Sequence, residues 1–137
     1  MTHPHSDFRV AFVDFFKKTG RLRDVKPEAL LARWEEFVDK CERGYPNDAQ
    51  DYTNELTARD SLEQAMESEE LQVFPELSKL CARVEVADAR FRPMLIPDVF
   101  PRMDRKLWWA RGMVRYGRKR LVESLRREYG IEIDEME

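Results

Sequence analysis

Hydrophobic and polar residues are sorted along residues 27–45 with the period of an α-helix. The apolar side chains recur at spacings of three and four: Leu30, Leu31, Trp34, Phe37, Val38, Cys41 and Tyr45. Charged side chains take the remaining positions, and only a helix of period 3.6 places the two sets on opposite faces. Because this stripe is wide and carries an indole at its centre, we expect the helix to be surrounded by its neighbours.

Four further helices are predicted from the same periodicity and from the residues at their ends. Caps of Ser, Asn or Asp, prolines in a first turn, and glycine or proline stops mark their boundaries. They span Ser6 to Gly20, Asn47 or Asp48 to about Glu67, Pro75 to about Phe91, and Asp104 to Gly130. The sequence therefore predicts an all-α fold, a compact bundle of about five helices in a single domain of 137 residues.

The last predicted helix and the segment before it are unusual. Gly112 and Gly117 interrupt the helix, so it either bends there or is approached closely by another backbone. Residues 93–103 contain three prolines, which exclude a continuous helix, yet they are too apolar for a solvated loop. We expect this segment to pack as an extended strap between the fourth and fifth helices. The alternative is an exposed apolar strip that receives a partner.

Both ends of the chain are predicted to be irregular. Residues 1–5 form a flexible tail in this interpretation. Residues 131–133 alternate like a strand, but the run is too brief to support a sheet. We therefore predict an acidic tail over residues 131–137, of which residues 134–137 are disordered.

Charge is distributed unevenly along the chain, although the net charge is only −3. Residues 28–88 carry 16 acidic and 6 basic side chains, a net of −10, whereas residues 102–127 carry 10 basic and 2 acidic side chains, a net of +8. Either the two regions neutralise one another inside the fold, or each faces a partner. The sequence leaves both possibilities open.

Common catalytic and cofactor motifs are missing. The two histidines, His3 and His5, lie in the predicted tail, so a histidine-based nucleophile or a diiron site has no histidine within the fold. No glycine-rich phosphate-binding loop is present. We therefore predict no metal and no cofactor, and consider an enzyme improbable.

Cysteine usage and hydropathy predict where in the cell the protein is located. Cys41 and Cys81 each lie on an apolar stripe, which is typical of buried thiols in a reducing compartment, although a bridge between them stays open. The sequence has neither an apolar run of membrane-spanning length nor a signal-peptide pattern. We expect a soluble, cytoplasmic protein without a membrane partner.

Two groups of charged residues on the third helix have structural interpretations. Glu55 and Arg59 are one turn apart on the inner face, in the order that favours a salt bridge, and we predict a semi-buried ion pair between them. Asp48, Asp51 and Glu55 follow one side of the helix. Such a row can bind a cation or supply an acid and a base, but it is more often a solvated face.

The clearest binding signal is the basic, aromatic stretch from Arg102 to Arg127. The predicted binding residues are Arg105, Lys106, Trp108, Trp109, Arg111 and Arg115. One of the two adjacent tryptophans can be buried while the other is exposed, and we select Trp109 as the contact residue because Trp and Arg are enriched at binding hot spots. The competing interpretation docks this helix on the acidic ones, with its arginines paired to Glu55, Glu85 or Asp88.

Three function hypotheses follow. The first is a non-catalytic protein-interaction module, such as an adaptor, a subunit, or an immunity or inhibitor protein of bacterial type, acting through a charged and aromatic surface. The second is nucleic-acid binding through the basic C-terminal helix, where charges meet phosphates and rings stack on bases. An acidic protein with pI near 5.6 disfavours it. The third is an enzyme that uses carboxylates.

Overall fold

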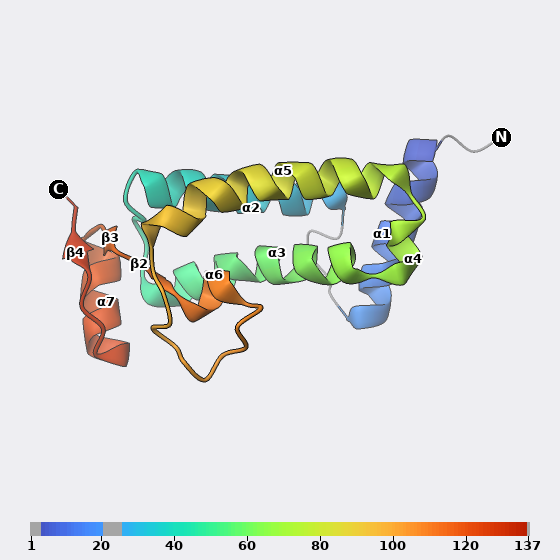
Figure 1. The fold of residues 1–137 in the computed structure, drawn as a ribbon. Helices are drawn as coiled ribbons and strands as arrows, with labels where there is room; N and C mark the ends of the chain where they lie inside the picture. Colours follow the sequence, from blue (N-terminus) through green and yellow to red (C-terminus); the bar gives the residue numbers. More distant parts are fainter. Residues whose placement is uncertain (1–3, 21–25, 137) are drawn as a thin grey trace.

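The computed structural model describes residues 4–20 and 26–136, and helices dominate it (Figure 1). Within these ranges the α-helices are α1 (Pro4–Thr19), α2 (Pro27–Glu42), α3 (Ala49–Glu67), α4 (Glu69–Gln72), α5 (Pro75–Phe91), α6 (Trp108–Arg111) and α7 (Lys119–Tyr129). A 3-10 turn, η1 (Arg92–Met94), follows α5. The strands have two residues each: β1 (Leu95–Ile96), β2 (Met113–Val114), β3 (Tyr116–Gly117) and β4 (Asp134–Glu135). The all-α class is confirmed, with more and shorter elements than the five helices predicted.

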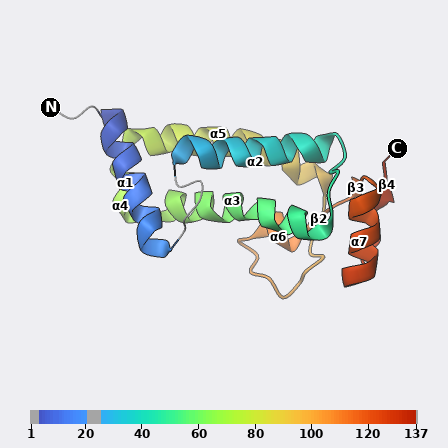
Figure 2. The ribbon, with the colours of Figure 1, turned by 180° about the vertical axis from the view of Figure 1, so that it is seen from behind.

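Helix α2 is the centre of the fold, as its apolar stripe predicts. It packs against α3 and α5, and these three long helices lie side by side in both views (Figures 1 and 2). Trp34 and Phe37 are fully buried on α2 and contact one another and Phe91 of α5 through their rings. Tyr45, just beyond the helix, is buried against Phe37 as well.

The predicted boundaries of the long helices hold because their end signals are local. Pro27 and Pro75 occupy the first turns of α2 and α5, where a missing N–H costs nothing. Asp48 caps α3 by accepting a hydrogen bond from the Asp51 backbone N–H at 2.9 Å. Gly44 follows α2 with a positive φ of 87°, a conformation that glycine adopts without steric cost.

Helices α1 and α7 lie at opposite ends of the three long helices (Figures 1 and 2). Helix α1 begins at Pro4, two residues before the predicted cap at Ser6, and buries Phe8, Phe12 and Phe16. Contacts of α1 with the short helix α4 close this end of the fold. Residues 68–74, which connect α3 to α5, therefore include the helical turn α4.

The single long helix predicted from Asp104 to Gly130 is wrong. Only Trp108–Arg111 and Lys119–Tyr129 are α-helical, and β2 and β3 lie between them. Strand β2 pairs antiparallel with β1, with Ile96 opposite Met113. A Cβ added at Gly112 would lie 2.8 Å from the Ile96 carbonyl oxygen, so glycine is required where the two backbones meet. Of the two explanations offered for the interruption, the close approach of another backbone is the one that applies at Gly112.

The disorder predicted at residues 134–137 is also wrong in the part of the segment that the structure describes. Strand β4 pairs in parallel with β3, and the Asp134 N–H donates to the Arg115 carbonyl at 2.9 Å. Ile133 is buried and packs near Gly117. A short strand can therefore be stable when a partner strand and a core site for its apolar side chain are both available.

The proline-rich segment divides into two parts. Met94 and Leu95 are buried, and β1 lies against the core through its pairing with β2. Residues 97–107 then form a loop that extends away from the three long helices (Figure 1). The loop is tied to α6 by the Phe100 N–H, which donates to the Arg111 carbonyl at 2.9 Å.

Candidate functional site

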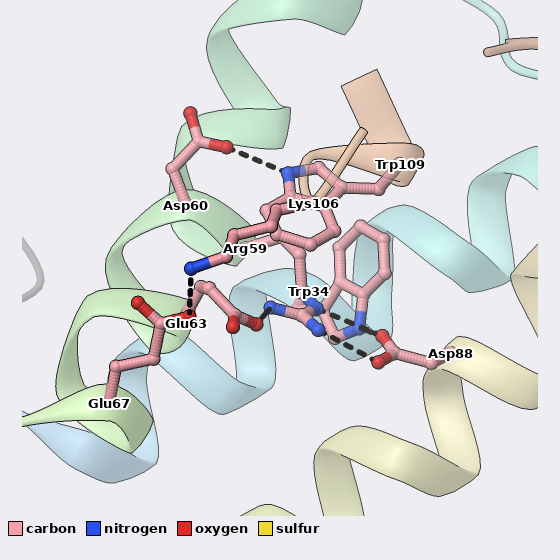
Figure 3. A network of polar contacts seen from close by, with 8 residues as sticks. All are labelled: Trp34, Arg59, Asp60, Glu63, Glu67, Asp88, Lys106 and Trp109. Atoms are coloured by element: carbon pink, nitrogen blue, oxygen red, sulfur yellow. Dashed lines mark hydrogen bonds and ion pairs between the residues drawn. The ribbon is translucent and has the colours of Figure 1, made fainter. Parts of the chain in front are cut away.

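A buried network of polar side chains joins the three long helices (Figure 3). Arg59 of α3 donates from Nε and Nη2 to the two carboxylate oxygens of Asp88 on α5, at 3.0 and 2.9 Å. The indole N–H of Trp34 on α2 donates to the same carboxylate at 3.1 Å, and Arg59 also bonds Glu63 at 2.9 Å. Every polar group in this network therefore has a partner, as buried charges require.

Arg59 remains charged in this environment. Burial disfavours the cation, but the hydrogen bonds to Asp88 and its charge, with Glu63 adding to both effects, outweigh the burial and raise the pKa of Arg59. The predicted pair between Glu55 and Arg59 is therefore wrong, since each takes other partners. Glu55 accepts hydrogen bonds from Lys40 at 2.8 Å and from the Tyr45 hydroxyl. Arg59 thus pairs with Asp88 of α5 and with Glu63, one turn further along α3, and not with Glu55.

Trp109 anchors the short helix α6 to this network (Figure 3). Its side chain is 0% exposed, its indole N–H donates to Asp60 of α3 at 2.7 Å, and the Arg59 guanidinium lies 4.1 Å from its ring centroid. Trp109 was the contact residue selected from the sequence, and its burial makes that choice wrong. The adjacent Trp108 is the partly exposed member of the pair.

A pocket of about 640 Å³ opens beside α6, on the side that carries Trp108. It is formed by η1, β1, the 97–107 loop, α6 and the turn between β2 and β3. The lining residues are Arg92, Pro93, Leu95, Pro97, Asp98, Arg105, Trp108, Arg111 and Arg115. Its volume falls within the usual range of small-ligand sites. Four guanidinium groups and one carboxylate give the lining a net charge of +3, in a chain whose net charge is −3.

The lone carboxylate of the lining is already committed to a structural role. Arg111 donates from Nε to Asp98 at 2.5 Å, and from Nη1 to the carbonyls of Met103 and Pro101 at 2.6 and 3.1 Å. Asp98 has a positive φ of 56°, which Asp tolerates better than most residues, and this turn presents its carboxylate to Arg111. Arg111 therefore holds the loop that forms one wall of the pocket.

The other three arginines of the lining have no carboxylate partner within residues 4–20 and 26–136. Arg92 lies with its guanidinium 4.0 Å from the centroid of the Trp108 ring, a cation–π contact that leaves its N–H donors available. Arg105 and Arg115 have exposed side chains. The Arg115 backbone is fixed on both sides, since its N–H donates to Met94 and its carbonyl accepts from Asp134. A rigid frame thus presents unneutralised guanidinium groups to one cavity.

Four of the six predicted binding residues line this pocket: Arg105, Trp108, Arg111 and Arg115. Lys106 instead reaches Glu67 of α3 at 3.9 Å, a contact between exposed side chains (Figure 3). Of the partners named in the competing interpretation, Glu55 and Asp88 are wrong, because those carboxylates bind Lys40, Tyr45, Arg59 and Trp34.

Sequence reasoning missed Arg92 and Asp98 as pocket residues. Both lie in or beside the proline-rich segment, which was interpreted as a packing strap or as an exposed apolar strip, and not as part of a charged pocket. The available signal was the position of Arg92 directly before Pro93. A helix ends at such a residue, so its side chain lies where the chain changes direction.

The acidic row on α3 and the two cysteines do not form a second site. Asp48 caps α3 and Glu55 is paired, so two of the three carboxylates in the acidic row hold the fold together. Cys41 and Cys81 are free thiols, and burial raises the pKa of both. Among the residues that the structure describes, no group of three or more His, Cys, Asp and Glu side chains is placed to hold a metal ion.

Comparison of the chain with models of protein families, with curated proteins and with solved structures found no match. In the described ranges, every helix is too short or too polar to cross a lipid bilayer.

Proposed function

We propose that this chain is a non-catalytic interaction protein. It binds a negatively charged segment of a partner protein in the pocket beside α6, called here the arginine pocket after Arg92, Arg105, Arg111 and Arg115. One observation carries the proposal: three arginines without a carboxylate partner in the described ranges line a pocket of about 640 Å³, and backbone hydrogen bonds fix Arg115 on both sides. Unpaired guanidinium groups bind carboxylates and phosphates through two parallel hydrogen bonds, which gives both attraction and orientation.

Two features favour a protein partner over a nucleic acid: the clustering of arginines at one pocket and the covering of both neighbouring tryptophan rings. Three arginines without a carboxylate partner in the described ranges share one pocket, whereas binding along a nucleic-acid backbone uses a long charged groove with free aromatic faces. Trp109 is buried, and Arg92 already covers the Trp108 ring. These contacts reduce the surface on which a base could stack.

The chemistry of the site favours binding over catalysis. Its charged lining consists of arginines, which stay protonated, and of Asp98, which is paired with Arg111. A general base would need a group that can accept and release a proton near neutral pH. We further propose that the protein acts in the cytoplasm, because Cys41 and Cys81 are free thiols, as is typical of a reducing compartment.

An affinity-capture experiment with cell extract from the native source tests the proposal. The bait is the full chain, compared with the double variant Arg105→Glu/Arg115→Glu, which reverses two pocket charges. The matched control is Lys119→Glu/Arg120→Glu on α7, which makes the same change in net charge at exposed residues outside the pocket. We expect the original chain and the control to retain the same partner protein and the pocket variant to lose it. Equal retention by all three baits would contradict the proposal.

Nucleic-acid binding is separated by a second measurement on the same proteins. A single-stranded oligonucleotide that bound the original chain with a steep loss of affinity as salt increased would support the competing function. If that binding were also lost in the pocket variant, the pocket would belong to a nucleic-acid site and the protein-partner proposal would be wrong.

A further inference from the structure

The ligand class of the arginine pocket follows from a comparison of charges and donors. A carboxylate carries one negative charge and two oxygens, so one arginine can satisfy it. The pocket offers Arg92, Arg105 and Arg115 in addition to Arg111, whose Nε and Nη1 donors are engaged with Asp98 and two carbonyls. A single carboxylate would leave most of these charges uncompensated.

A phosphate monoester matches the pocket better. It carries about −1.5 to −2 charges at pH 7 and three strong acceptor oxygens. The three available guanidinium groups come from three different segments, η1, the 97–107 loop and the turn after β2, so they can approach one phosphate from different sides. The planar forks of Arg fit phosphate oxygens in bidentate geometry.

The uncharged part of the lining indicates what carries the phosphate. Pro93, Leu95 and Pro97 contribute apolar surface, and Trp108 adds an indole on which Arg92 lies. An anion attracted by Arg92 is therefore brought against an aromatic and aliphatic wall. A phosphate attached to an apolar carbon group can contact the arginines and this wall together.

We propose that the pocket recognises a phosphorylated side chain of the partner protein, with the phosphate monoester held by Arg92, Arg105 and Arg115. This inference rests on the proposed function, because it specifies the chemical group on the partner that the pocket binds. Free phosphate metabolites share the same chemistry, and the experiment below includes an arm for them.

Calorimetric titration of the full chain with three small probes tests the ligand class. The probes are phenyl phosphate, phenyl sulfate and benzoate, which share the ring and differ in the anion. We expect phenyl phosphate to bind at least tenfold more tightly than benzoate at pH 7.5. Equal affinities for the three probes, or tighter binding of benzoate, would overturn the inference.

The pH dependence of binding gives a second, independent readout. A phosphate monoester becomes a dianion around pH 6, so its dianionic fraction rises about tenfold between pH 5.0 and 7.5. The sulfate ester keeps one charge throughout. The charged groups that face the ligand are four arginines and Asp98, and any titration of the pocket itself would affect both esters. We expect phenyl phosphate affinity to rise several-fold over this range while phenyl sulfate affinity stays level. Parallel profiles would contradict dianion recognition.

Variants locate the binding. Arg105→Gln and Arg115→Gln should each weaken phenyl phosphate binding about tenfold, while Arg120→Gln on α7 should leave it unchanged, since Arg120 is exposed and outside the lining. Unchanged binding in both pocket variants would place the phosphate elsewhere. If inorganic phosphate binds as tightly as phenyl phosphate, the apolar wall contributes nothing to binding. The assignment of the ligand to a phosphorylated side chain would then be wrong.

Phosphatase treatment of the cell extract separates this inference from the proposed function. If capture by the original chain depends on the pocket arginines and is abolished by phosphatase, both stand. If capture depends on those arginines but survives phosphatase, the partner contributes carboxylates and the inference is wrong, although the proposed function holds. If the pocket variant captures the partner as well as the original chain does, the proposed function itself is refuted.

Discussion

Removing the carboxylate of Asp88 should destabilise the protein far more than removing an exposed one. Asp88→Ala leaves the Arg59 guanidinium, whose side chain is 4% exposed, without its bidentate partner, and leaves the Trp34 indole N–H without its acceptor. Breaking one half of a buried ion pair costs about 3–5 kcal/mol, because the remaining charge stays desolvated. Against a typical unfolding free energy of about 5–15 kcal/mol, this is a large fraction of the stability.

Glu35→Ala provides the matched control. Glu35 of α2 binds Arg83 of α5 at 2.9 and 3.0 Å, so it also links two long helices, but the Arg83 side chain is 64% exposed. Exposed pairs contribute roughly 0–1 kcal/mol. Both pairs join two long helices, but the Glu35 pair is exposed and uses a single nitrogen of Arg83, Nη2.

Urea unfolding followed by circular dichroism measures the difference. With an m-value of about 2 kcal/mol per molar urea, Asp88→Ala should lower the midpoint by about 2 M, and Glu35→Ala by less than about 0.5 M. Asp88→Asn keeps an acceptor for the indole and should fall between them. Equal midpoints for Asp88→Ala and Glu35→Ala would refute the view that a desolvated pair joins the helices.

Three further outcomes are expected. Trp109→Ala should cost about 3–5 kcal/mol in urea unfolding, because it empties a fully buried site, whereas Trp109→Phe should cost less. Gly112→Ala should cost about 1–3 kcal/mol, since the new Cβ would meet the Ile96 carbonyl oxygen at 2.8 Å, and no loss of stability would contradict the close approach. Burial raises the pKa of Tyr45 and Tyr52, so their phenols ionise in the unfolded chain at a lower pH than in the folded one. Stability should therefore fall as the pH rises above about 10, by about 1.4 kcal/mol per pH unit and ionising group, and Tyr45→Phe should reduce that slope.

The long helices were predictable because their signals are local. Apolar residues three and four apart place Trp34 and Phe37 on one face of α2, and prolines, a capping Asp and glycines mark the ends of the helices. No contact distant in the sequence has to be known to interpret these features. The buried state of Trp34 therefore followed from the pattern alone.

The last third of the chain was not predictable in the same way, because contacts distant in sequence decide it. Helical spacing over residues 104–129 competes with the pairing of β1 and β2, and the close approach at Gly112 resolves that competition. The same is true of β4, which forms only because β3 lies beside it. A single-sequence pattern contains neither partner strand.

The two adjacent tryptophans show the limit of the site prediction. Their spacing requires that they point in different directions, so one buried and one accessible ring was a sound expectation. Which of them is buried depends on Asp60 and Arg59 of α3, since these residues bind Trp109. The basic composition of the stretch nevertheless identified Arg105, Arg111 and Arg115 before their common pocket was known.

The central claim is that Trp109 is locked in the core while Trp108 faces an anion-binding pocket. Nuclear magnetic resonance of the three indole N–H groups tests it most directly, with assignments from single Trp→Phe variants. The N–H of Trp34 and Trp109, bonded to carboxylates, should exchange slowly with solvent, and that of Trp108 quickly. Added phenyl phosphate should shift the Trp108 signal and leave the other two in place. Rapid exchange at Trp109, or a ligand-dependent shift of its signal in place of the Trp108 signal, would contradict the account.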